Sequence, residues 1–220
     1  MTDSVLNLLI VDDHPLFRQG LTQLLRTENA FHVVGEAASG RDGLAAAARL
    51  QPDVVLLDLN MKDMSGLEVL QQLQAGQPDI KVIMVTVSDQ SDDLVRALRS
   101  GASGYLLKDM EPEAMLEAIH GVAAGRVIVS ETLVDLMAEA LRNERRPGSV
   151  SEAGLTEQEQ RILERIAVGL SNKLIARDLN IAEGTVKVHV KHILRKLGLR
   201  SRVEAAVWAV ARQRNSQPSH

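Results

Sequence analysis

The stretch LNLLIVDDHP, residues 6–15, runs from an apolar segment directly into two carboxylates and sets the pattern for the first half of the chain. Four more apolar runs follow: FHVVGEA at 31–37, VVLL at 54–57, KVIMV at 81–85 and GYLL at 104–107. Short, nearly uninterrupted runs of this kind are typical of parallel strands that helices cover on both faces. We therefore expect five buried strands.

A helical pattern follows each apolar run. The expected helices span Pro15 to Arg26, Arg41 to Gln51, Leu67 to Leu73, Asp93 to Ser100 and Glu111 to Ala124. Strands that alternate with helices predict an α/β fold with a doubly wound parallel sheet. In such a sheet the functional crevice lies at the carboxyl ends of the strands, where the winding reverses.

Polar residues stand where four of these strands should end: Asp12 and Asp13, Asp58, Thr86 and Lys108. Three carboxylates brought together repel by about 4 kcal/mol per pair at an effective dielectric near 20, unless a cation lies between them. Oxygen ligands and a nearby phosphate suit Mg²⁺. With Lys108 as a second positive charge, Asp58 is the expected nucleophile in a phosphoryl transfer.

Four motifs in this half, IVDDHP, LLDLNM, VTVSD and GYLLKD, resemble those of a two-component response-regulator receiver domain over roughly residues 6–125. The resemblance implies a flavodoxin-like sheet of strand order 2-1-3-4-5 and a sensor histidine kinase as partner. It implies that Asp58 accepts the phosphoryl group. It implies that Mg²⁺ is held by Asp13 and Asp58 directly, by Asp12 through water, and by the Asn60 backbone carbonyl. The residues that would signal the phosphorylated state are Thr86, Tyr105 and Lys108.

The composition favours a two-part intracellular protein. A length of 220 residues suits two modest domains, and the chain has no Cys for disulfides or thiolate chemistry. We expect neither a membrane span nor an export signal, and hence a cytoplasmic protein, because no apolar run approaches 18 residues. We interpret His14, His189 and His192 as solvated or packing side chains, since they lack the spacing of a metal site.

The charge is divided unequally along the chain. Residues 1–130 hold 10 Lys plus Arg against 18 Asp plus Glu, whereas residues 151–220 hold 12 against 7. A basic domain joined to an acidic one is typical of a nucleic-acid binder with a separate control domain. We expect a receiver over 1–127, a linker helix (132–142) and flexible tether within 128–152, and a DNA-binding domain over 153–216.

The basic part divides into four helical patterns, and the middle pair is typical of a helix-turn-helix. They span Glu157 to Val168, Asn172 to Leu179, Gly184 to Leu197 and Arg202 to Arg212. On the third, the expected core face consists of Val186, Val190, Ile193 and Leu197. The opposite face, with Gly184, Lys187, Val188, Lys191 and Arg195, suits the major groove of DNA. The residues expected to hold DNA phosphates are Lys173, Arg177, Arg195, Lys196, Arg200 and Arg202.

This region resembles the LuxR-type helix-turn-helix over roughly residues 153–212, and the whole chain is similar to the NarL family of response regulators. The resemblance implies base contacts by Lys187, Val188 and Lys191, and control of nitrate- and nitrite-responsive genes. Ala182 stands where Ser or Thr commonly caps the recognition helix, at a cost of about 1 kcal/mol.

One such module buries too little surface, roughly 600–1,000 Å², for strong specific binding, so we expect a homodimer on paired half-sites once the protein is phosphorylated. A small apolar stripe on the last helix is available for self-association or for core packing: Val203, Ala206, Val207 and Val210. The alternative function is a Mg²⁺-dependent aspartyl-phosphate phosphohydrolase. It is disfavoured because Asn60 stands where such enzymes carry a second Asp as general acid, so we expect no enzyme beyond self-phosphorylation and slow autodephosphorylation.

Overall fold

The computed structural model describes residues 5–77, 80–88, 91–126 and 153–216. By spatial contacts the chain separates into two compact units, one built on a sheet and one built on the C-terminal helices. Helix α4 (Ser91–Arg99) groups with the second unit. The predicted linker helix and the greater part of the predicted tether lie outside the described residues.

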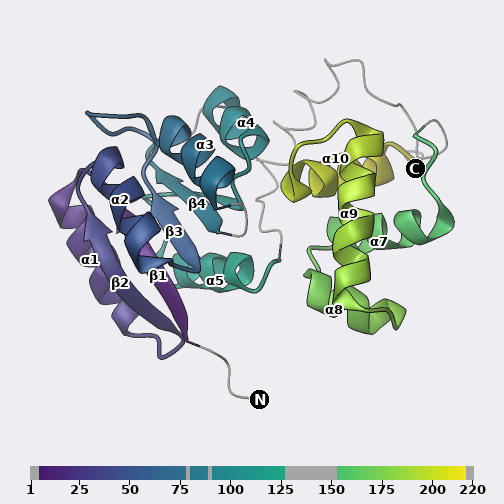
Figure 1. Cartoon of the computed structure of the whole chain (residues 1–220), viewed down its shortest axis with the longest axis horizontal. Coiled ribbons are helices and arrows are strands. Elements are labelled where there is room, and N and C mark those ends of the chain that lie inside the picture. Colours follow the sequence, from purple (N-terminus) through teal and green to yellow (C-terminus); the bar gives the residue numbers. More distant parts are fainter. Residues whose placement is uncertain (1–4, 78–79, 89–90, 127–152, 217–220) are drawn as a thin grey trace. The chain divides into compact units, whose positions relative to one another are not determined.

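Five parallel strands form the sheet in the order β2-β1-β3-β4-β5, as predicted (Figure 1). The strands are β1 (Leu6–Val11), β2 (Phe31–Ala37), β3 (Val54–Leu57), β4 (Lys81–Thr86) and β5 (Gly104–Leu107). Strands β1 and β3 meet at the reversal of winding, where Val11 is in register with Leu57. The residues that follow, Asp12 and Asp58, therefore leave the sheet side by side.

Four helices complete the first unit: α1 (Pro15–Arg26), α2 (Gly40–Leu50), α3 (Gly66–Gly76) and α5 (Pro112–Ala123). Helix α1 contacts α5, and α2 contacts α3. All four residues of β3 are buried, because helices cover both faces of the sheet. Pro15 begins α1, and Ser39 and Ser65 cap α2 and α3 by accepting hydrogen bonds from the third backbone N–H of each helix.

The second unit contains α7 (Glu157–Ala167), α8 (Asn172–Leu179), α9 (Glu183–Leu197) and α10 (Arg202–Ser216). Thr156 and Ser171 cap α7 and α8 by accepting hydrogen bonds from the third backbone N–H of each helix. Asn180 takes the left-handed conformation between α8 and α9, with φ of 53°, and so turns the chain tightly within the helix-turn-helix. Gly198 ends α9 in the same conformation.

The core of the second unit confirms most of the predicted face of α9. Val186, Ile193 and Leu197 are fully buried, whereas Val190 is only partly covered. Ile162 of α7 and Ile175 of α8 are also fully buried, and α9 contacts both of these helices. The face of α9 opposite to this core is thereby left on the surface. In the described part of the chain, no helix has the length and apolar character needed to cross a membrane.

Candidate functional site

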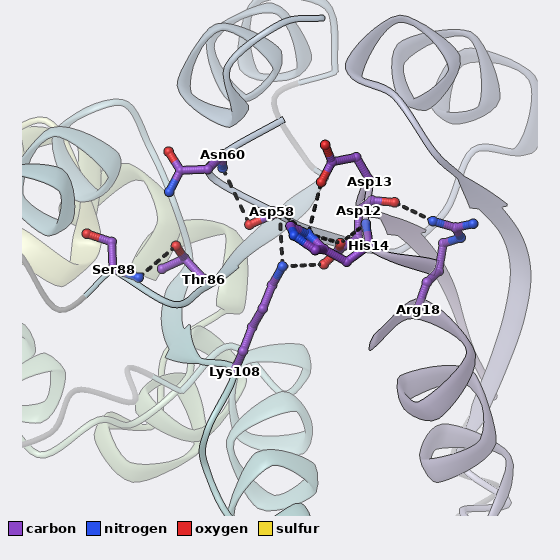
Figure 2. Close-up of polar contacts among 9 residues, drawn as sticks. All are labelled: Asp12, Asp13, His14, Arg18, Asp58, Asn60, Thr86, Ser88 and Lys108. Atoms are coloured by element: carbon purple, nitrogen blue, oxygen red, sulfur yellow. Dashed lines mark hydrogen bonds and ion pairs between the residues drawn. The ribbon is translucent and has the colours of Figure 1, made fainter. Parts of the chain in front are cut away.

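Four charged side chains converge at the carboxyl ends of β1, β3 and β5, where the sequence predicts a crevice (Figure 2). Asp12 and Asp58 are almost fully buried, at 2% and 3% exposure, and Asp13 is partly buried. Lys108 Nζ lies 2.8 Å from Asp12 Oδ2 and 3.0 Å from Asp58 Oδ2. The predicted convergence of the three carboxylates with Lys108 is therefore present.

Lys108 is held in this position from two sides. Its backbone N–H donates to the carbonyl oxygen of Thr86 at 2.8 Å, which keeps the end of β5 against the end of β4. Its ammonium nitrogen also lies 4.8 Å from the centre of the Phe17 ring on α1. A cation over an aromatic face is stabilised by the ring quadrupole. The ammonium group is thus fixed as a positive charge between two buried carboxylates.

The electrostatics of the cluster favour an added cation. Burial raises the pKa of Asp58, and the nearby Asp12 raises it further, while Lys108 and the backbone N–H of Asn60 lower it. Three carboxylates and one ammonium leave a formal excess of two negative charges, which a divalent ion would balance. Carboxylate oxygens are hard donors of the kind that Mg²⁺ prefers, so the residues present fit that ion.

The backbone around Asp58 is tightly constrained. Asp58 N–H donates to the Val11 carbonyl at 2.8 Å, and Asn60 N–H approaches Asp58 Oδ1 at 3.4 Å. A Cβ at Gly66, the first residue of α3, would collide with the Asp58 carbonyl oxygen and would lie 2.8 Å from Leu59 Cα. Only glycine fits there. Sequence reasoning missed Gly66, although a glycine just after the Ser65 cap was a visible signal of close backbone approach.

Thr86 and Tyr105 meet at a common partner, Ser88. The Thr86 hydroxyl accepts a hydrogen bond from Ser88 N–H at 3.1 Å, and the Tyr105 hydroxyl donates to the Ser88 carbonyl at 3.0 Å. Both side chains are buried, and Tyr105 points inward. The two residues expected to act as a switch therefore both hold the segment that follows β4.

His14 lies inside the carboxylate cluster, which the sequence interpretation of a solvated or packing histidine did not anticipate. Its Nδ1 is 2.9 Å from Asp13 Oδ1, 3.4 Å from Asp12 Oδ1 and 3.7 Å from Asp58 Oδ2. One ligand atom from each of these four residues falls within 4.8 Å of all the others. The signal available in the sequence was its position directly after the two aspartates.

The surface of α9 that faces away from the core carries the predicted base-reading residues. Lys187, Val188 and Lys191 are exposed, as are Gly184 and Arg195. The side chain of Val188 is 53% exposed, which is unusual for a large apolar residue of a packed helix. Two cations beside an exposed apolar group form a surface suited to guanine acceptors and thymine methyl groups.

Lys196, predicted to hold a DNA phosphate, is instead engaged within its own unit. Its ammonium nitrogen lies 2.7 Å from Glu159 Oε2 and 2.9 Å from the Gly154 carbonyl oxygen. Glu159 is buried and also completes the capping box of α7 with Thr156. The charge of Lys196 is therefore balanced by a carboxylate and directed at the start of α7, while its contact with a DNA phosphate stays a prediction.

Arg202, also predicted to hold a DNA phosphate, likewise has partners within its own unit. Its guanidinium donates to Asn172 Oδ1 at 2.7 Å and to the Leu170 carbonyl oxygen. Burial lowers the pKa of Arg202 to about 10. The side chain thus ties the first turn of α10 to the start of α8. The other four predicted phosphate ligands are exposed: Lys173, Arg177, Arg195 and Arg200.

The apolar stripe of α10 is largely buried in the structure. Val203, Ala206 and Val207 are 3%, 4% and 1% exposed, and Val210 is partly covered. Helix α10 packs against α7 and α9. Of the two interpretations left open by the sequence, core packing is the one that these positions display.

Comparison with known proteins agrees with this geometry. The model of the response regulator receiver domain matches residues 8–120, and the model of the bacterial regulatory proteins of the luxR family matches residues 153–209. The chain therefore belongs to the two-component response regulators with a LuxR-type DNA-binding domain, and is a phosphorylation-dependent DNA-binding regulator. Such a receiver and DNA-binding domain imply a kinase and DNA as partners, and receiver domains bind Mg²⁺ at this acidic pocket.

Within that family, the chain resembles nitrate/nitrite response regulators. It is 49% identical to the nitrate/nitrite response regulator protein NarL of Escherichia coli K12, over 91% of this chain and 93% of that protein. It is 45% identical to the nitrate/nitrite response regulator protein homolog of Haemophilus influenzae, over 92% and 95%. Among solved structures, the response regulator ChrA of a heme-sensing two-component system matches with a TM-score of 0.51 at 31% identity, over 96% and 98%.

Proposed function

We propose that this response regulator controls nitrate- and nitrite-responsive genes of anaerobic respiration, and that a sensor histidine kinase phosphorylates it at Asp58. The observation that supports Asp58 as the acceptor is its place among Asp12, Asp13 and Lys108 at the reversal of winding. The names of the two relatives support the nitrate or nitrite signal. The cell compartment that fits this role is the cytoplasm.

In the proposed transfer, a carboxylate oxygen of Asp58 attacks the phosphorus of a phosphohistidine on the kinase. The new O–P bond forms as the P–N bond breaks, and the imidazole nitrogen that leaves recovers a proton from solvent. Lys108 Nζ, 3.0 Å from Asp58 Oδ2, is placed to neutralise charge on the phosphoryl oxygens. The raised pKa of Asp58 also makes its carboxylate a stronger base and nucleophile.

Mg²⁺ would supply the remaining positive charge when bound. Asp13 and Asp58 would hold it directly, Asp12 through water, and Asn60 through its backbone carbonyl. Asn60 is also the residue that disfavours a phosphohydrolase, because its amide cannot act as a general acid for a leaving group. The proposed chemistry is accordingly a single transfer to Asp58 followed by slow loss of the phosphoryl group, rather than turnover of a substrate.

The proposed switch begins at Thr86. Its hydroxyl already accepts a hydrogen bond from Ser88 N–H and retains one O–H donor for a phosphoryl oxygen. A movement of Thr86 toward the phosphoryl group would therefore displace Ser88, because the two residues are hydrogen-bonded. The Ser88 carbonyl also accepts a hydrogen bond from the Tyr105 hydroxyl, so Tyr105 would be affected as well. Phosphorylation would in this way shift the segment after β4, which leads into α4.

DNA recognition is assigned to the exposed face of α9, with Lys187, Val188 and Lys191 at base edges in the major groove. Phosphate contacts are assigned to six cations, of which the first four are exposed and the last two also have partners within the domain: Lys173, Arg177, Arg195, Arg200, Lys196 and Arg202. Two copies of the chain would occupy paired half-sites, since one module buries roughly 600–1,000 Å². The α10 stripe would contribute to that dimer only if Val210 or a neighbour became accessible.

The phosphorylation step is tested by incubating the full chain with a small phosphodonor and Mg²⁺, and Asp58→Asn beside it. Incorporation of one phosphoryl group in the wild type and none in the variant is expected, with tighter DNA binding for the wild type alone. Equal labelling of both proteins would place the acceptor elsewhere. Continuous release of phosphate from the donor at enzymatic rates would favour the phosphohydrolase.

DNA contacts are tested by comparing Lys187→Ala with Lys173→Ala over a range of salt. Loss of Lys187 should relax discrimination among base sequences by about 1–3 kcal/mol. Loss of Lys173 should weaken binding to all sequences alike and reduce the salt slope by about 1. Equal effects on specific and nonspecific DNA from both variants would contradict the assignment of α9 as the reading helix.

The signal is tested in cells of the source organism that carry either the wild type or Asp58→Asn as the sole copy. Transcripts are compared with and without nitrate or nitrite under oxygen limitation. A nitrate response that depends on Asp58 is expected. If transcript levels depend on Asp58 but do not change with nitrate or nitrite, the regulator responds to a different signal.

A further inference from the structure

The spacing of His14 from the carboxylates matches that of ligands around one metal ion. An ion with bonds of about 2.1 Å holds neighbouring donor atoms roughly 3.0 Å apart in an octahedron and roughly 3.4 Å apart in a tetrahedron. His14 Nδ1 lies 2.9 Å from Asp13 Oδ1 and 3.4 Å from Asp12 Oδ1. Asp58 Oδ2, at 3.7 Å, is slightly farther. Figure 2 shows the ring of His14 directed into this group of oxygens.

His14 and Lys108 approach the cluster without competing for the same oxygens of Asp12. Lys108 Nζ pairs with Asp12 Oδ2, whereas His14 Nδ1 is near Asp12 Oδ1. Asp13 Oδ1 is buried, and its close polar contact is His14 Nδ1 at 2.9 Å, with no hydrogen bond from another donor. A polar atom buried in this way calls for an ion or donor beside it. The negative charge of Asp13 is therefore not balanced by Lys108, and a cation bound by both Asp13 and His14 would balance it.

The backbone of His14 is anchored, and its ring is largely exposed. Its N–H donates to Asp12 Oδ1 at 2.7 Å, and its carbonyl accepts from Arg18 N–H at 3.1 Å in the first turn of α1. The side chain itself is 66% exposed. Because little of the ring is packed against other side chains, a small rotation that brings Nδ1 to an ion would not disturb the fold.

We propose that His14 Nδ1 is a direct nitrogen ligand at the phosphoacceptor site, and that it makes the site bind first-row transition-metal ions more tightly than Mg²⁺. This inference rests on the metal site of the proposed function. Imidazole nitrogen suits ions such as Co²⁺ and Ni²⁺, whereas Mg²⁺ prefers oxygen and keeps its water. A mixed nitrogen and oxygen donor set therefore selects for the transition metals.

Direct ligation is tested on the full-length protein loaded with Mn²⁺, by pulsed electron paramagnetic resonance at the frequency of ¹⁴N. The wild type should show a coupled nitrogen that His14→Ala removes. Titrations should show that His14→Ala weakens Co²⁺ binding by about tenfold or more. The affinity for Mg²⁺ should change by less than about twofold, because Mg²⁺ does not require the imidazole.

A matched control is His120→Ala, because His120 contacts Glu28 outside the cluster. It should keep both the nitrogen coupling and the Co²⁺ affinity. If the wild type binds Mn²⁺ but shows no coupled nitrogen, His14 is not a ligand. That result would still be consistent with metal binding by the carboxylates. Metal binding that is unchanged in Asp58→Asn overturns the proposed site itself, and the role of His14 with it.

Discussion

The recognition helix α9 begins without the side-chain cap that α2, α3, α7 and α8 possess. Ala182, its N-cap residue, has φ of −69° and ψ of 145°, close to the values at Ser171 of α8, −72° and 164°. Ser171 Oγ accepts from the N–H three residues on, at 3.3 Å. Ala182 has no side-chain oxygen for this purpose, although its backbone carbonyl accepts from Thr185 N–H at 3.0 Å, and it is exposed. The substitution Ala182→Ser should therefore add a hydrogen bond from Thr185 N–H without steric conflict.

The expected gain follows from the cap alone. Replacing a capping Ser by Ala typically costs about 1 kcal/mol, so the reverse change should raise the free energy of unfolding by about the same amount. In a domain of the size of residues 153–216, that corresponds to a rise in Tm of roughly 4–8 °C. Trp208 is the only Trp of the chain and is buried on α10, so its fluorescence reports the unfolding of this domain.

The assay is urea unfolding followed by Trp208 fluorescence, with three variants. Ala182→Ser should move the midpoint upward. Ser171→Ala should move it downward by a similar free energy, because it deletes the equivalent bond on α8. Ala182→Val, which adds volume but no acceptor, should bring no gain. If Ala182→Ser leaves the midpoint in place, the bond from Thr185 N–H to the Ala182 carbonyl already satisfies this end of α9, and the reasoning is refuted.

Three other substitutions test the electrostatics and packing. Asp58→Asn should stabilise the sheet unit at neutral pH, because the raised pKa of Asp58 means that the native state disfavours the ionised carboxylate. That gain should shrink in metal-free melting curves as pH falls through the raised pKa toward 3.8, and a gain constant with pH would contradict it. Gly66→Ala should prevent labelling of Asp58 by a phosphodonor and destabilise by about 1–3 kcal/mol, since its Cβ collides with the Asp58 carbonyl; normal labelling would disprove the constraint. Burial raises the pKa of Glu159, but hydrogen bonds from Lys196 and Thr156 outweigh burial and lower the pKa overall. The contribution of the Glu159 carboxylate to the free energy of unfolding is therefore present above pH 4.5 and is lost as pH falls through the lowered pKa. Glu159→Gln should accordingly lower the free energy of unfolding, followed by Trp208 fluorescence, by about 1.5–3 kcal/mol at neutral pH. The loss should be smaller in a Lys196→Met variant, because the ion pair between Lys196 and Glu159 is already broken there.

The receiver site could be predicted from sequence because topology alone places it. Parallel strands end at one edge of the sheet, so a polar residue after each apolar run must arrive there whatever the details of packing. Asp12, Asp58 and Lys108 needed no more than that. His14 and Gly66 needed more: the direction of a ring after the strand has ended, and the approach of two backbone segments within a few ångströms. Neither is encoded by periodicity.

The DNA-binding surface could be predicted only in part, because helical periodicity gives the face of a helix but not what another helix places beside it. Arg195 and Lys196 are neighbours in sequence, yet Arg195 is exposed and Lys196 is paired with Glu159 across the interface with α7. Arg202, too, reaches acceptors near the start of α8. Counting cations along the sequence does not show which of them pair within the domain: Arg165, Lys196 and Arg202 each contact a residue of another helix. Substitution of Lys196 or Arg202 should therefore lower the stability of the domain, whatever it does to DNA binding.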